Sequence, residues 1–231
     1  DAKYIYPPDI NMSLFEYDKF IAYNSLFMYY YIVEKCSNIN YENKNLGIII
    51  KYFNLFLSIA SWYILLYTIF EKNVELSLHT LSCVTIKNSM IKWFYYIKYV
   101  EWLDTVFLLI KKKKVSTLHY YHHMIVPLLV YLNIGEENNG AQYYVLVSNS
   151  LAHGLMYFYY AYPNKLRKYS KVVTLVQTIQ HFGALIIILN QYNNYNNCDF
   201  NKIPFILGLI CYIFFFVEFT KILFKSKLKI K

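Results

Sequence analysis

The stretch from Met90 to Met124 constrains the fold most, because it sets ionisable side chains inside sequence that otherwise has the character of membrane spans. These side chains are Lys98, Glu101, Asp104, His119, His122 and His123. Ionisable groups are costly in lipid, and inside spans they usually face a protein interior that has a function. The four consecutive lysines at 111–114 divide the stretch into two halves. It therefore predicts two antiparallel spans that are joined at a membrane surface and face each other with polar stripes.

The spacing within each half is helical. Lys98, Glu101 and Thr105 stand at i, i+3 and i+7, and Asp104 follows Glu101 by three residues. Residues three, four and seven apart share one face of an α-helix. The three histidines at 119, 122 and 123 stand at i, i+3 and i+4, which again places them on one face.

The composition indicates an all-α integral membrane protein with a single domain over residues 1–231. Of its residues 57% are hydrophobic and only 16% are charged, whereas a soluble domain carries about 25% charged residues. Several windows approach the ~20 apolar residues that cross a bilayer. We expect about seven transmembrane helices, at roughly 20–33, 46–70, 84–110, 115–134, 141–162, 172–191 and 203–224.

The distribution of basic residues predicts the orientation. Segments 34–45, 111–114, 163–171 and 221–231 hold 15 Lys and Arg, whereas the tail and loops on the other side hold four. Basic loops face the cytosol, so the C-terminus is expected there and the N-terminus in the lumen. Lys227 and Lys229 resemble a dilysine retrieval signal of the endoplasmic reticulum, with an ordinary basic flank as the alternative. The net charge is +9, and the basic residues lie between the expected spans. This position favours anionic lipid or a phosphate-bearing ligand over nucleic acid as their partner.

The four cysteines contain no C-x-x-C pair, so they do not indicate a metal cluster. In the expected topology Cys83 and Cys198 both lie on the oxidising, lumenal side, where a disulfide persists. The sequence leaves two outcomes open, a Cys83–Cys198 disulfide or two free thiols.

Two more polar stripes follow further along the chain. The first contains Asn149, His153, Met156, Tyr157 and Tyr160, and the second contains Thr174, Gln177, Gln180 and His181. Hydrogen bonding between membrane helices is the simplest alternative role for such stripes. It does not explain why stripes on four consecutive spans include Lys, Glu, Asp and five histidines. We therefore expect one shared polar interior.

The histidine pattern suggests several chemistries. Histidines at i, i+3 and i+4 can hold a metal, and membrane di-iron hydroxylases and desaturases use several such boxes. This chain has six histidines in total, which favours a nucleophilic or acid–base role with no metal. A di-iron lipid hydroxylase or desaturase and a seven-helix transporter remain as alternatives.

Four motifs together resemble a known family. They are Lys98-x-x-Glu101-x-x-Asp104-Thr105, His119-x-x-His122-His123, His153-x-x-Met156-Tyr157-x-Tyr159-Tyr160 and Thr174-x-x-Gln177-x-x-Gln180. In this order they resemble the signature motifs of the ELO family of very-long-chain fatty acid elongases, and the likeness covers about residues 46–225. The resemblance implies a 3-ketoacyl-CoA synthase of the endoplasmic reticulum that condenses an acyl-CoA with malonyl-CoA and needs no cofactor. It also implies six helices around an acyl tunnel with one helix packed outside, the reductases and dehydratase of the elongation cycle as partners, and a homodimer as an open possibility.

The resemblance also implies roles for individual residues. His122 would form an acyl-imidazole, although direct attack with histidine acting only as a base stays open. His153 would exchange protons, and His119, Asn149 and Gln177, with His123 beside them, would position the reacting groups. Asp104 and Glu101 would set the tautomers of the histidines, and Lys98 would balance the charge of these carboxylates. The implied substrate-binding residues are Lys111, Lys112, Lys165, Arg167 and Lys168 for CoA phosphates, with Tyr157, Tyr160 and Gln180.

Overall fold

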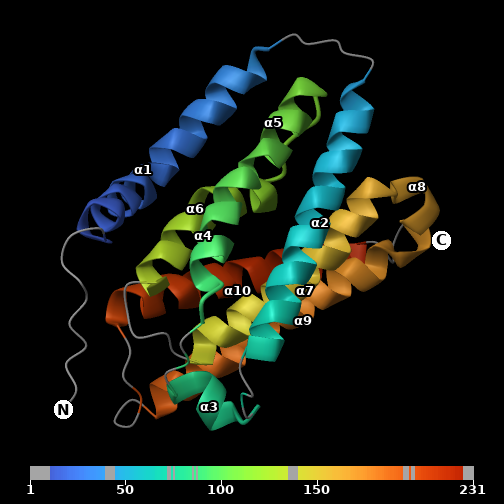
Figure 1. The fold of residues 1–231 in the computed structure, drawn as a ribbon. Coiled ribbons are helices and arrows are strands. Elements are labelled where there is room, and N and C mark those ends of the chain that lie inside the picture. Colours follow the sequence, from blue (N-terminus) through green and yellow to red (C-terminus); the bar gives the residue numbers. More distant parts are fainter. Residues whose placement is uncertain are drawn as a thin grey trace.

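The computed structural model describes residues 11–39, 45–71, 74, 76–84, 86, 88–134, 140–194, 198 and 201–225, with side chains described from Tyr17 onward. All regular structure within these ranges is helical (Figure 1). The longer helices are α1 (Asn11–Ser37), α2 (Leu46–Glu71), α4 (Ile91–Val100), α5 (Trp102–Ile110), α6 (Thr117–Ile134), α7 (Gly140–Ala161), α9 (Ser170–Asn193) and α10 (Lys202–Lys225). The short ones are α3 (Leu78–Cys83), α8 (Pro163–Leu166) and the 3-10 turn Arg167–Tyr169.

Three helical segments within the described ranges are long and apolar enough to cross a membrane. They are Leu46–Glu71, Pro163–Asn193 and Lys202–Lys225. Helices α4 and α5, with 10 and 9 residues, are too short to cross a membrane singly, and α6 and α7 carry polar stripes. The chain is thus all-α with membrane-spanning character, and the count of seven spans stays a prediction.

The region before the third expected span differs from the prediction. That span was expected from about residue 84, but α4 begins at Ile91. The side chain of Asn88 accepts a hydrogen bond from the backbone N–H of Met90 at 2.8 Å, which forms a turn instead of a helix. The sequence analysis also missed α3, whose first turn is capped by the Ser77 hydroxyl.

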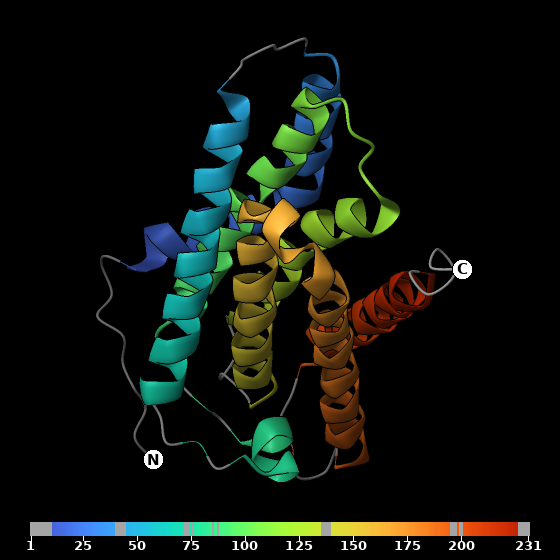
Figure 2. The same ribbon diagram turned by 90° about the vertical axis from the view of Figure 1, so that its right-hand side faces the viewer.

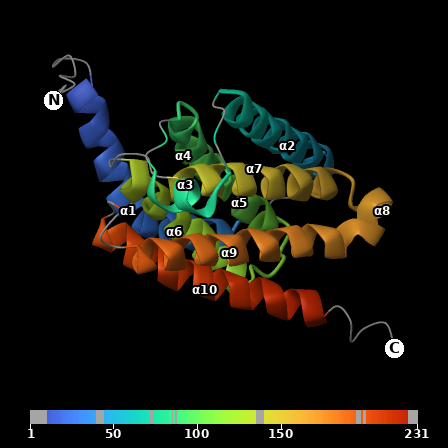
Figure 3. The ribbon, with the colours of Figure 1, turned by 90° about the horizontal axis from the view of Figure 1, so that it is seen from below.

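The helices pack as a closed series of neighbours. Helix α7 lies between α2 and α9, and α9 lies between α7 and α10, as the view from below shows (Figure 3). Helix α6 contacts α10 and α4, and Phe53 on α2 meets Phe107 on α5 at 5.2 Å between ring centroids. Helix α1 packs on the outside of α5 and α6.

Helices α2 and α7 approach each other closely along much of their length (Figure 2). At Gly154 a Cβ atom would come within 2.9 Å of the indole nitrogen of Trp62, so only glycine fits without a shift of the Trp62 ring. The Ser58 hydroxyl donates to the Gly154 carbonyl at 2.8 Å. This contact fixes the rotation of α7 and so the direction of the adjacent His153.

The two ends of the α7–α9 pair have different partners. At one end α3 contacts both helices, and a disulfide joins Cys83 at the end of α3 to Cys198. At the other end α8 connects α7 to α9. Lys111 and Pro163 line the same cavity, so the basic segments 111–114 and 163–171 lie at the α8 end. Two of the four segments that were assigned to one side of the membrane therefore lie together, whereas the two lysines at 227 and 229 lie outside the described residues.

Candidate active site

The core of the site is a buried charge network between α4, the α4–α5 junction and α7. Lys98 donates to Glu101 at 2.8 Å and to the amide oxygen of Asn149 at 3.0 Å. The same Glu101 oxygen lies 3.0 Å from Nδ1 of His153. Lys98 and Glu101 are 2% and 1% exposed, so the ion pair is shut away from solvent. Because an ionised carboxylate only accepts, Nδ1 of His153 carries a proton and Nε2 is left as an acceptor.

Glu101 lies at the junction between two helices. It separates α4 from α5, yet its backbone N–H still bonds to the carbonyl of Ile97 at 2.9 Å. The helical direction therefore continues through the junction, and Asp104 follows one turn later. Asp104 accepts a hydrogen bond from the Tyr157 hydroxyl at 2.7 Å.

The partner of Asp104 differs from the expectation. Asp104 and Glu101 were both expected to set histidine tautomers, but within the described ranges Glu101 is the one of the two that is hydrogen-bonded to a histidine. The third polar group of this face, Thr105, takes that role for another histidine, because its hydroxyl lies 2.8 Å from Nε2 of His119.

The three histidines of α6 have different surroundings. His119 is bound to Thr105, and its ring lies 4.2 Å from the ring of His123. The backbone carbonyl of His123 accepts from the indole of Trp102 at 2.8 Å. His122 faces His153, with 6.1 Å between ring centroids, and packs on Phe215 of α10. Among the described residues, no hydrogen bond involves a ring nitrogen of His122.

These groups face a hollow that we call the histidine cavity, with a volume of about 570 Å³. Most of the expected catalytic residues line it: Asp104, His119, His122, His123, Asn149, His153 and Gln177. Lys98 and Glu101 lie behind this wall and hold it in place. Gln177 donates to the sulfur of Met156 at 3.2 Å. The stripes of four helices thus meet at one hollow.

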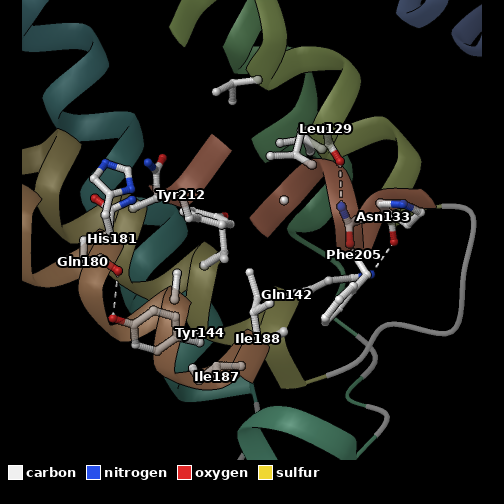
Figure 4. Close-up of a pocket in the computed structure, with 18 of the residues that line it drawn as sticks. Leu129, Asn133, Gln142, Tyr144, Gln180, His181, Ile187, Ile188, Phe205 and Tyr212 are labelled. Atoms are coloured by element: carbon white, nitrogen blue, oxygen red, sulfur yellow. Dashed lines mark hydrogen bonds between the residues drawn. The ribbon is translucent and has the colours of Figure 1, made fainter. Parts of the chain in front are cut away.

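A second hollow, the apolar cavity, adjoins the first (Figure 4). Its wall is mainly aliphatic and aromatic, with Val126, Leu129, Ile187, Ile188 and Phe205 among its members. Figure 4 shows the Tyr144 hydroxyl bonded to the Gln180 carbonyl, at 3.1 Å, on this wall. Four side chains line both cavities: His122, Asn149, Gln180 and His181. They form the junction between the two.

The expected substrate-binding residues divide into two groups. Lys111, Tyr157, Tyr160 and Gln180 line the histidine cavity, and so does Lys113, which the sequence analysis did not select. Lys112 instead donates to the backbone carbonyl of Ile39 at 2.8 Å. Lys165, Arg167 and Lys168 lie on α8 and the following turn without lining either cavity, and Lys168 stacks over Tyr169.

Sequence reasoning missed two more residues of the site. His181 lies at the junction, and its Nδ1 has no hydrogen-bond partner among the described residues. Its place in the Thr174–His181 stripe was the available signal. Tyr29 of α1 is fully buried, and its hydroxyl lies 2.9 Å from Thr105. No local pattern distinguishes it from the neighbouring tyrosines of α1.

Comparison with known proteins identifies the family of the chain. Across the described ranges no three His, Cys, Asp or Glu side chains are grouped so that they could hold a metal ion. No curated protein matches the chain. The family model named GNS1/SUR4 matches residues 14–230, so the likeness includes α1 and is not restricted to residues after about 46. The chain therefore belongs to the ELO (GNS1/SUR4) family, the family of fatty acid elongases.

Proposed function

We propose that this protein is the condensing enzyme of fatty acid elongation, which joins a long-chain acyl-CoA to two carbons of malonyl-CoA through an acyl-imidazole on His122. The position of His122 is the observation that supports this most. It lies on the wall shared by the histidine cavity and the apolar cavity, and its ring nitrogens make no hydrogen bond within the described ranges. A thioester with its tail in the apolar cavity would present its carbonyl carbon to this ring.

In the first half-reaction an unprotonated nitrogen of His122 attacks the thioester carbon. The new C–N bond replaces the C–S bond, and CoA leaves as a thiol after it takes the proton from the second nitrogen of the ring. A covalent intermediate of this kind divides one difficult step into two easier ones.

In the second half-reaction malonyl-CoA loses CO₂, and the electron pair of the broken C–C bond attacks the acyl carbon. The C–N bond to His122 breaks, and the imidazole recovers a proton from solvent. The products are 3-ketoacyl-CoA, CO₂ and CoA, and the whole reaction consumes one proton.

The buried network supports both steps. Glu101 accepts from Nδ1 of His153, which leaves Nε2 of that ring to take the proton that His122 releases and to pass it to the leaving CoA sulfur. Lys98 bonds to the amide oxygen of Asn149, which leaves the amide N–H groups to bind the developing oxyanion. Each group is held by charged partners before the substrate arrives, so little reorganisation is needed.

The basic residues support an assignment of the cavity entrance and of the side of the membrane on which it lies. Lys111 and Lys113 line the histidine cavity and suit the phosphates of CoA. The basic asymmetry of the loops supports a cytosolic entrance under the positive-inside rule. We assign the protein to the endoplasmic reticulum membrane, where reductases and a dehydratase would complete the elongation cycle.

Intact-protein mass spectrometry tests the proposal. Acyl-CoA alone should add one acyl group to the protein and release free CoA, and malonyl-CoA should then convert the adduct to 3-ketoacyl-CoA. His122→Ala should lose both the adduct and the product, whereas His153→Ala should form the adduct slowly. His79→Ala, an exposed histidine on α3, is the matched control and should behave as the wild type.

Two results would change the proposal. Product without an adduct, together with ternary-complex kinetics, would replace the acyl-imidazole by direct attack. A purified protein that makes no 3-ketoacyl-CoA from any acyl-CoA in a panel, and that carries stoichiometric iron, would replace condensation by oxidative chemistry.

A further inference from the structure

Helix α1 adds a side chain to the site although it packs outside the other helices. The side chain is Tyr29, which is fully buried, whereas Tyr30 and Tyr31 are 57% and 61% exposed. The Tyr29 ring lies among Trp102, Tyr120 and His123, with centroid distances of 5.4, 5.5 and 6.3 Å. Its hydroxyl reaches Thr105 on α5, 76 residues away in sequence.

The hydroxyl groups form a relay to His119. The Tyr29 oxygen is 2.9 Å from the Thr105 oxygen, and the Thr105 oxygen is 2.8 Å from Nε2 of His119. Tyr29 and Thr105 are both 0% exposed, so bulk water does not reach these two hydroxyl groups. Each hydroxyl has one proton to donate.

Only one direction of the relay uses every donor. If Tyr29 donates to Thr105, the Thr105 proton goes to Nε2 of His119, and the proton of a neutral His119 is then on Nδ1. If His119 donated to Thr105 instead, the Tyr29–Thr105 contact could use only one of the two hydroxyl hydrogens, and the other would have no acceptor in this relay. An unpaired buried donor costs about 1–3 kcal/mol, which favours the first direction.

Contacts on both sides of Tyr29 hold α1 at this register. Before it, the Asp18 carboxylate accepts from the Tyr96 hydroxyl at 3.0 Å, and the Asp18 carbonyl accepts from Tyr95 at 3.3 Å. After it, Lys112 donates to the Ile39 carbonyl at 2.8 Å. The position of the Tyr29 hydroxyl is thus determined by three contacts between α1 and the bundle.

We propose that Tyr29 is a positioning residue for the condensation: acting through Thr105, it holds His119 in the tautomer whose Nδ1 carries the proton. His119 lines the histidine cavity, so this tautomer presents a hydrogen-bond donor to the reacting groups. Without the Tyr29 hydroxyl, the lone pair of Thr105 that accepted from it is free to accept from Nε2 of His119, so the preference for this tautomer is weakened. This inference rests on the proposed function.

A double-mutant cycle on the purified full-length protein tests the relay. Tyr29→Phe keeps the ring and removes only the hydroxyl, and it should lower kcat about five- to tenfold with little change in KM for malonyl-CoA. Thr105→Val should lower kcat at least as much, and adding Tyr29→Phe to it should change kcat by less than about twofold. Thr105→Ser should keep near-wild-type kcat and remain sensitive to Tyr29→Phe.

Controls separate this role from a structural one. Tyr30→Phe, on the exposed face of α1, should leave kcat unchanged. A purely structural Tyr29 would lower the unfolding temperature, and its effect on kcat would persist in the Thr105→Val background. If the wild type is active and Tyr29→Phe has the same kcat, or if the kcat losses of Tyr29→Phe and Thr105→Val are fully additive, the relay is overturned and the proposed function stands. If the wild type makes no 3-ketoacyl-CoA, the proposed function and the relay are both overturned.

Discussion

The histidine cavity and the apolar cavity share a wall but are built on different principles. Around the first, polar side chains have directional partners on other helices, as in the Lys98–Glu101–His153 network and the Tyr157–Asp104 and Thr105–His119 pairs. Around the second, residues such as Leu129 and Ile188 contribute volume and apolar surface. The difference teaches that chemistry needs atoms held at set positions, whereas an acyl tail needs only a slot of suitable size.

The two cavities should therefore respond differently to substitution. Replacing a buried ion pair by apolar groups of similar size is often neutral for stability, so such pairs are better explained by positioning than by stabilisation. An aliphatic wall tolerates changes in volume within limits. Changes at the first cavity should affect turnover, and changes at the second should affect which substrate is accepted.

The largest effect should come from removing the cation behind the histidine cavity. Lys98→Met leaves Glu101 as an unpaired buried charge, which should lower the free energy of unfolding by about 3–5 kcal/mol and abolish activity. Adding Glu101→Leu should restore most of the stability but no activity, because His153 then lacks its carboxylate. Denaturation in detergent with a parallel activity assay measures both. Lys92→Met, at an exposed position of α4, is the control, and equal stability of Lys98→Met and wild type would contradict the network.

A smaller and more selective effect should come from filling the apolar cavity. A Cβ atom at Gly208 on α10 would meet Ile188 at 3.8 Å, so there is room for a side chain. Gly208→Leu should lower the upper limit of acyl length by a few carbons and leave the rate with shorter chains intact. Each excluded methylene forfeits about 0.8 kcal/mol, or roughly fourfold in affinity.

An acyl-CoA panel from short to very long chains measures this limit. Gly208→Ala is the graded control and should shift it by less than Gly208→Leu does. An unchanged chain profile for Gly208→Leu would show that the tail does not enter the apolar cavity.

The smallest effect should appear at the entrance. Lys111→Ala removes one cation that lines the histidine cavity, so KM for the CoA substrates should rise about three- to tenfold with kcat unchanged. Lys114→Ala removes an equal charge from the same exposed segment without lining either cavity, and it should change KM by less than twofold. Equal effects of the two substitutions would indicate general electrostatic attraction and not a phosphate contact.

The sequence by itself determined the all-helical class and which helix faces carry the polar side chains of the candidate site. Because side chains three, four and seven residues apart share a helix face, the polar stripes of α4 to α7 and α9 could be predicted from the sequence alone. Their convergence on one cavity followed from the cost of ionisable groups in lipid. The family likeness pointed to His122 among three neighbouring histidines, which spacing could not rank.

Only the tertiary structure determined which side chains form hydrogen bonds with each other. Glu101 bonds to His153 across 52 residues, Asp104 bonds to Tyr157 across 53, and Tyr29 bonds to Thr105 across 76. Such pairs depend on how each helix is rotated and displaced against its neighbour, and close contacts such as Gly154 against Trp62 set that rotation. Local periodicity carries no record of it, which is why one tyrosine among several on α1 became part of the site only when the helices had packed.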